Sequence, residues 1–166
     1  MSSPRVSRKL YVCVLLLLCL QAVSAAPPLD TSEATAESAF SNGHYQQAIV
    51  HYQRLLHERP ADIGYRTRLA ESYEVSGNLE LAQEHASAVL QKQSRNSEAL
   101  MVMGRTHGRQ GEWGDAKAFY ERAVQADKNN AAAHLNLGQA LMQLGNDQEA
   151  EAQFTEYRRL TGITQP

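Results

Sequence analysis

The sequence predicts an all-α protein in which four antiparallel helix pairs stack into a right-handed superhelix. Glycine recurs with a step of 34 residues, at Gly43, Gly77, Gly111 and Gly145. Alanine keeps the same step five residues further on, at Ala48, Ala82, Ala116 and Ala150. Two further sets of residues keep the 34-residue step. One set is Tyr52, Ala86, Tyr120 and Phe154, and the other is Ala36, Ala70, Gly104 and Gly138. Such a period predicts one structural unit repeated four times, each closing its core only against its neighbours.

The first 25 residues have the layout of a secretory signal peptide. Arg5, Arg8 and Lys9 give a basic start, and residues 11–20 are an unbroken apolar run. Small residues follow at positions 23–25, where a signal peptidase recognises its site. We expect cleavage after residue 25.

Two alternatives remain open for this segment. Residues 10–26 are a marginal candidate for an uncleaved membrane anchor, because a spanning helix needs about 20 apolar residues and this stretch includes Gln21 and Ser24. A lipid-modified cysteine is the other alternative. Leu18 and Val12, which precede the two cysteines, are larger than the small residue that bacterial lipoprotein signals require there.

The fourth unit shows why each unit is a pair of helices. Residues 131–144 place apolar or small side chains on one helical face. Gly145 ends this helix, because glycine adopts the left-handed turn without steric cost. Residues 147–160 form a second amphipathic helix, and the small Gly138 and Ala150 let the two backbones approach closely.

The array has a linker before it and a polar end. Pro27 and Pro28 prevent a helix from continuing through the linker at residues 26–31. The repeat region is expected to cover residues 32–161. Its four units have approximate repeat boundaries at 29–62, 63–96, 97–130 and 131–161, and residues 162–166 form a tail. The repeat position that faces the next unit is held in turn by Leu56, Leu90, Val124 and Arg158. A polar side chain there is typical of a capping helix.

The alternative is that the last helix stays partly exposed and pairs two chains as a homodimer.

The repeat resembles the tetratricopeptide repeat over about residues 29–160. Residues 43–52 (GHYQQAIVHY) are similar to the second half of its consensus, and Pro60 stands at its helix-ending proline. Leu137 and Gly138 match its Leu-Gly pair. The resemblance implies a solenoid in which the first helix of each pair lines a concave groove that binds protein segments.

The resemblance also implies which side chains line that groove. They are Glu37, Phe40, Glu71, Glu74, Met101, Arg105, Arg109, Leu135, Gln139 and Met142. The groove is then acidic at its start, basic in its middle and apolar towards its end, which suits a partner segment with apolar anchors and mixed charges. Chaperone adaptors of the family grip a C-terminal carboxylate with basic groove residues. The corresponding repeat position here holds Glu33, Thr67, Met101 and Leu135, so we reject that function.

The residues favour binding over catalysis. Cys13 and Cys19, the two cysteines, lie in the export segment, and the sequence has neither a Gly-x-x-x-x-Gly-Lys phosphate loop nor a His-Glu-x-x-His motif. His51 and His57 are six residues apart and so face different sides of a helix, and His107 is expected to pack. We therefore expect no enzyme, no cofactor and no specific metal site. A formal charge of −2 without a basic block does not favour nucleic acid.

The expected function is a periplasmic scaffold of the bacterial envelope. Its partner would be a protein or peptide segment in a pilus, secretion or export assembly. This expectation follows the export signal and a loose similarity to small exported repeat proteins, including Tad-type pilus assembly proteins, although those are usually lipoproteins. The alternative is a membrane-anchored structural or self-associating subunit, held by residues 10–26.

Overall fold

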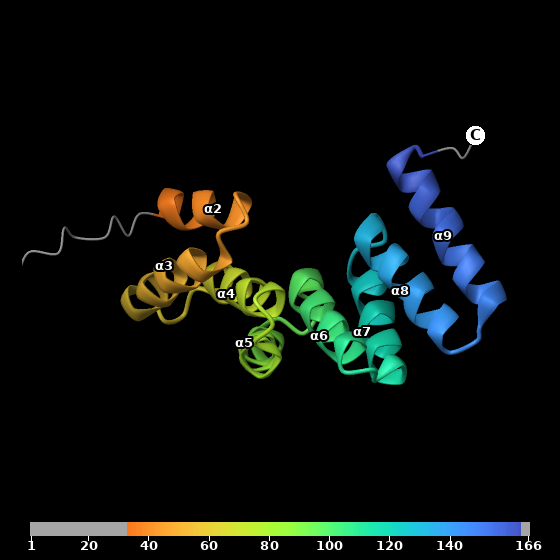
Figure 1. Ribbon diagram of the computed structural model, residues 1–166, viewed down its shortest axis with the longest axis horizontal. Helices are drawn as coiled ribbons and strands as arrows, with labels where there is room; N and C mark the ends of the chain where they lie inside the picture. The colour runs from red at the N-terminus through yellow and green to blue at the C-terminus, as the bar shows by residue number, and fades with distance from the viewer. Residues whose placement is uncertain (1–32, 164–166) are drawn as a thin grey trace, which may run out of the picture. The chain divides into compact units, whose positions relative to one another are not determined.

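The computed structural model describes residues 33–163, which form eight α-helices and no strand (Figure 1). The pairs are α2 (Glu33–Ser41) with α3 (Tyr45–Glu58), α4 (Ile63–Val75) with α5 (Leu79–Lys92), α6 (Ser97–Arg109) with α7 (Trp113–Ala126), and α8 (Ala131–Gln143) with α9 (Asp147–Thr161). Each helix packs on the next in chain order, and α6 also contacts α4 and α8. The all-α solenoid expected from the repeat period is therefore confirmed. The expected signal peptide and linker lie outside the described residues.

The helix boundaries repeat because their capping residues repeat. Asp62, Asn96 and Asn130 precede the first helix of the later three pairs, and each accepts a hydrogen bond from the amide three residues on, at 2.9–3.0 Å. Between the helices of a pair stands a glycine with a left-handed backbone, such as Gly145 at φ +76°. The expected turn at Gly145 is thus confirmed.

Small residues within the pairs let the two helices approach closely. A Cβ atom added at Gly104 would lie 2.4 Å from the Tyr120 ring, and one added at Gly138 would lie 2.5 Å from the Phe154 ring. The alanines five residues after each turn glycine are buried in all four pairs. The glycine and alanine columns are therefore explained by contact between helices.

The buried side chains form two apolar clusters that meet at α6. Ala99, Val102 and Met103 belong to the cluster built mainly from α2 to α5, whereas Leu100 and Met101 belong to the cluster built from α6 to α9. One helix thus presents opposite faces to two cores, as stacked repeats require.

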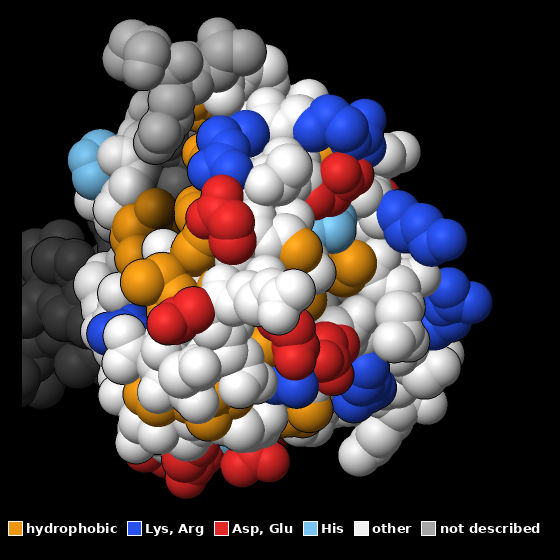
Figure 2. Space-filling model, turned by 90° about the vertical axis from the view of Figure 1, so that its right-hand side faces the viewer, with side chains coloured by type: hydrophobic (Ala, Val, Ile, Leu, Met, Phe, Trp, Pro, Cys, Tyr) orange, Lys and Arg blue, Asp and Glu red, His pale blue; other side chains and the backbone are white. Residues whose placement is uncertain are grey.

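The outer face of α9 is polar where earlier units are apolar. Arg158 pairs with Glu151 at 2.6 Å and bonds the Thr155 hydroxyl at 2.9 Å, whereas Leu56 at the equivalent position of the first unit is buried. Figure 2 shows this end of the helical array, where apolar side chains lie in small areas between charged ones. Among the described residues no helix is long and apolar enough to span a membrane.

Candidate partner-binding groove

Two hollows lie between the first helices of the first three pairs. The first hollow has a volume of about 340 Å³ and is lined by Glu33, Glu37, Tyr52, Arg59, Asp62, Gly64, Tyr65 and Arg68. The second hollow has a volume of about 400 Å³ and is lined by Ile63, Gly64, Thr67, Arg68, Glu71, Gln93, Asn96 and Glu98. Gly64 and Arg68 border both, so the hollows adjoin. Of the predicted groove residues, Glu37 lines the first hollow and Glu71 lines the second.

Tyrosine hydroxyls hold two carboxylates of the first hollow. Tyr52 donates to Glu37 Oε2 and Tyr65 donates to Glu33 Oε2, each at 2.7 Å. Arg59 Nη1 in turn donates to the Tyr65 hydroxyl at 2.9 Å. Both acceptors come from α2, whereas the donors come from α3 and α4. Packing of the first two units therefore fixes these acids in place.

Arg68 stands between the hollows and links its own helix, α4, to α2. Its guanidinium bonds Glu37 of α2 at 3.2 Å and Glu71 of its own helix at 3.0 Å. It also lies over the Phe40 ring, 4.7 Å from the centroid, in cation–π geometry. The charge of Arg68 is therefore engaged by protein groups on two sides.

Burial gives two of these groups altered titration. Desolvation raises the pKa of the Glu71 carboxyl, and this outweighs the hydrogen bond from Arg68, which acts in the opposite direction. Desolvation and the bond to Glu37 raise the pKa of the Tyr52 hydroxyl. Glu71 is thus a carboxylate whose negative charge its surroundings do not fully compensate.

In the middle of the groove, the two predicted arginines pair with a predicted acid. Glu74 is only 5% exposed and accepts a bond from Arg105 Nε at 2.9 Å. Arg109 reaches back from the next unit to the carboxylate at 3.4 Å and also donates to the Glu74 backbone carbonyl. Both arginines are therefore paired with one buried acid, which leaves a formal charge of +1 on this group of three side chains.

One other predicted groove residue is not available either, and the end of the groove is apolar only in part. Met101 is 4% exposed because it belongs to the second core. In α8, Leu135 is half-buried, Gln139 is exposed and Met142 is 54% exposed. The expectation of exposure is thus wrong for Glu74 and Met101, while the binding role of the exposed members stays a prediction.

Sequence reasoning missed several residues of the hollows. Arg68, Gly64 and Glu98 lie at repeat positions that the expected pattern of groove residues did not include, yet they border the hollows. Asp62 and Asn96 are the N-caps of α4 and α6. Because capping alone explains these residue types, the sequence gives no separate signal that they line the hollows.

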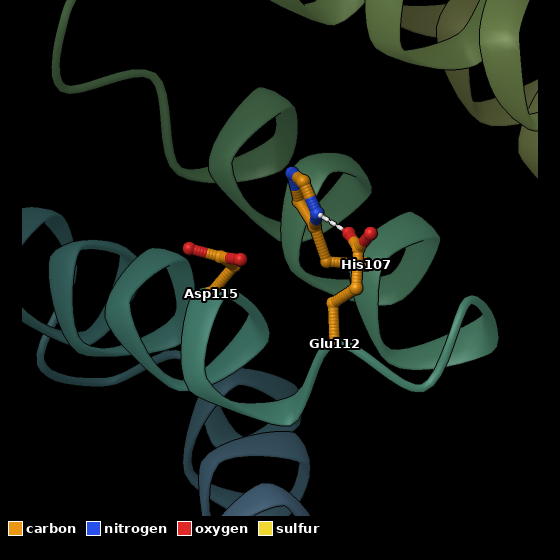
Figure 3. A group of neighbouring side chains, drawn as sticks. All are labelled: His107, Glu112 and Asp115. Carbon is orange, nitrogen blue, oxygen red and sulfur yellow. Dashed lines mark hydrogen bonds and ion pairs between the residues drawn. The ribbon is translucent and has the colours of Figure 1, made fainter.

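A separate group of polar side chains lies at the turn between α6 and α7. His107, Glu112 and Asp115 bring one possible metal-ligand atom each within 4.8 Å of one another (Figure 3). His107 Nδ1 is 2.5 Å from Glu112 Oε2, and the imidazole stacks on Phe119 with ring centroids 5.3 Å apart. Packing thus fixes His107, as expected. Asp115 stands in the first turn of α7, where the helix dipole favours a carboxylate without any metal.

The fold and the groove define a helical-repeat protein of the protein-binding class. Family profiles described as Tetratricopeptide repeat match residues 39–106 and 101–162. The chain therefore belongs to the tetratricopeptide-repeat family, whose members are typically non-enzymatic scaffolds that bind protein or peptide partners.

Known proteins similar to this chain share its fold. The thermophilic TPR protein TTC0263 of Thermus thermophilus has a TM-score of 0.68 at 22% identity, over 75% of this chain and 70% of that one. MamA from Desulfovibrio magneticus RS-1 has a TM-score of 0.67 at 19% identity, over 76% and 71% of the two chains. At these identities the similarity shows the fold.

One curated relative is similar in sequence. The Heat-shock protein cognate (HSC) co-chaperone sgt12 of Aspergillus fumigatus is 25% identical over 118 residues, which are 71% of this chain and 35% of that protein. This chain thus spans about a third of its relative's length.

Proposed function

We propose that this chain is a non-enzymatic scaffold of the bacterial cell envelope that binds an extended segment of a partner protein in its groove. The partner would belong to a pilus, secretion or export assembly. The observation that carries the proposal is the pair of adjoining hollows on the first helices, which offers fixed polar groups to a segment lying across successive units. The basic, apolar and small-residue segments of residues 1–25 support export.

Photo-crosslinking in the native host tests this function. A photoreactive amino acid replaces Gln139 or Met142, which are exposed members of the predicted groove on α8. In a control it replaces Glu84, which is exposed on the second helix of its pair. We expect both groove positions to capture the same envelope protein and Glu84 not to capture it. The proposal is wrong if the groove positions capture nothing or all three positions give the same products.

The second candidate is a membrane-anchored structural or self-associating subunit. The apolar stretch at residues 10–26 favours an anchor, and Met142, Leu144 and Ile163 leave apolar surface exposed near the end of the array. The mass of the protein recovered from envelope fractions separates the candidates. A chain that begins at Ala26 excludes the anchor, and a chain that retains residues 10–26 in the membrane fraction supports it.

A further inference from the structure

The two hollows are one site repeated after 34 residues. Their linings share five repeat positions, held in the first and second hollow by Glu33 and Thr67, Glu37 and Glu71, Arg59 and Gln93, Asp62 and Asn96, and Gly64 and Glu98. The protein backbone around the two hollows is therefore arranged alike. A peptide whose main chain fits the first hollow can fit the second hollow in the same way. This repetition suits an extended segment that contacts both hollows with successive side chains.

The lining of the hollows is strongly acidic. Glu33, Glu37, Asp62, Glu71 and Glu98 provide five carboxylates against the two guanidinium groups of Arg59 and Arg68, which leaves a formal charge of −3. Hollows bounded by protein strengthen the field of such a group of charges relative to an open surface.

The two arginines are held by internal contacts, whereas several carboxylates retain capacity to accept hydrogen bonds. Arg68 is engaged by Glu37, Glu71 and the Phe40 ring, and Arg59 lies over the Tyr65 ring while donating to its hydroxyl. A carboxylate can accept about four hydrogen bonds. From residues that the structure describes, Glu33 receives one hydrogen bond, donated by the neutral Tyr65 hydroxyl, and Glu37 receives two.

The environment of Glu71 agrees with the same conclusion. Burial disfavours its charge and Glu98 adds repulsion, so its pKa is raised although Arg68 is bonded to it. A cation in the second hollow would remove part of that cost, whereas an anionic ligand would increase it.

We infer that the two hollows bind a cationic segment of the partner protein, with arginine or lysine side chains placed in successive hollows. The inference rests on the proposed function, because it names the chemistry of the segment that the groove holds. Each hollow is near the lower end of the 300–1,000 Å³ range of ligand sites, which suits single side chains. The opposite end of the groove, with Gln139 and the exposed Met142, has no acidic residue among its predicted members and would contact an uncharged part of the segment.

Peptide binding to the full chain tests the inference. The probes are three fluorescent peptides that carry arginine, glutamine or glutamate at the same positions of a Gly-Ser backbone, and the measurement is fluorescence anisotropy at several salt concentrations. We expect only the arginine peptide to bind, with an affinity that falls as salt screens the charges. The double variant Glu33→Gln and Glu37→Gln should bind it roughly tenfold more weakly. Glutamine preserves the acceptors of the tyrosine bonds, so the fold should stay intact.

A matched control has the same charge change outside the hollows. Glu58→Gln with Glu84→Gln removes two exposed carboxylates on α3 and α5, and this variant should bind the arginine peptide as the natural chain does. Equal losses in the two variants would show unspecific attraction and overturn the inference, as would binding of the glutamate peptide. If crosslinking at Gln139 still captures a partner while the arginine peptide does not bind, the proposed function stands and this inference fails.

Discussion

At the scale of the residue, two glycines decide how closely the helices of a pair approach. Gly104 faces the Tyr120 ring and Gly138 faces the Phe154 ring, at separations that leave no room for a methyl group. Gly114 is also a helical glycine, in the first turn of α7, but a Cβ atom added there would meet no atom within 4 Å. The contrast separates a glycine required by packing from one that is not.

Gly104→Ala should therefore destabilise the protein, while Gly114→Ala should stabilise it. Overpacking of a close helix contact costs about 1–3 kcal/mol, whereas alanine for glycine at an unhindered helical position gains roughly 0.5–1 kcal/mol. Urea denaturation followed by circular dichroism gives both values. Equal effects of the two substitutions would show that the Tyr120 contact does not control this approach.

Glu71 makes the stability depend on pH in an unusual direction for a carboxyl. Its pKa is raised above the ordinary 4.5 in the folded protein, so its contribution to the free energy of unfolding is most favourable below 4.5 and declines as pH rises through the raised value. Glu71→Gln removes this decline while keeping an acceptor for Arg68. The stability of the variant relative to the natural chain should thus increase from acidic to neutral pH.

Thermal unfolding of both proteins across this range checks the sign. Glu98→Gln is a suitable comparison, since the negative charge of Glu98 is one cause of the raised pKa, and it should reduce the decline without abolishing it. A variant that loses stability relative to the natural chain as pH rises would mean that Arg68 compensates Glu71 fully.

At the scale of the element, α9 closes the array through its charged outer face. The Arg158–Glu151 pair occupies positions where the first unit has the buried Leu56 and Ile49. The substitutions Arg158→Leu and Glu151→Ile give the last helix the apolar outer face of the first unit. Because an uncapped repeat buries its apolar face against another chain, we expect concentration-dependent association, measured by size-exclusion chromatography with light scattering.

The same composition change can be made elsewhere on α9 as a control. Arg159 and Glu156 also form an ion pair, and the Arg159 side chain is largely exposed. Arg159→Leu with Glu156→Ile should leave the association state of the natural chain unchanged if position, not hydrophobicity alone, decides association. Equal association of the two double variants would contradict the assignment of Arg158 to the capping face.

The sequence was sufficient for the elements but not for all side chains of the groove. The glycine and alanine columns predict helix pairs, because they reflect contacts inside each unit, such as Gly138 against Phe154. The burial of Met101 could not be read from the repeat, since it depends on how α6 contributes to the second core. The pairing of Glu74 with Arg109 joins side chains 35 residues apart and likewise requires the stacked arrangement.

At the scale of the whole helical array, α6 connects the two cores. Its side chains enter both apolar clusters, with Val102 in the first and Leu100 in the second. A disturbance of one core should therefore be transmitted to the other. Two buried tyrosines provide a probe in each, because Tyr52 lies in the first cluster and Tyr120 in the second.

Alkaline titration should unfold both cores together, because neither hydroxyl ionises readily inside the protein. Burial raises the pKa of Tyr120 from 10.0 to about 12, so the stability that its neutral form contributes is complete below pH 10 and is lost as pH rises towards 12. The part of the tyrosinate absorbance that rises only as pH approaches 12 and the far-ultraviolet circular dichroism should then change in one common transition. Tyr120→Phe removes one of the ionisations and should move the transition to higher pH, whereas Tyr157→Phe on the half-buried face of α9 should leave it nearly unchanged. Two separate transitions, with only the second sensitive to Tyr120→Phe, would show that α6 does not couple the cores.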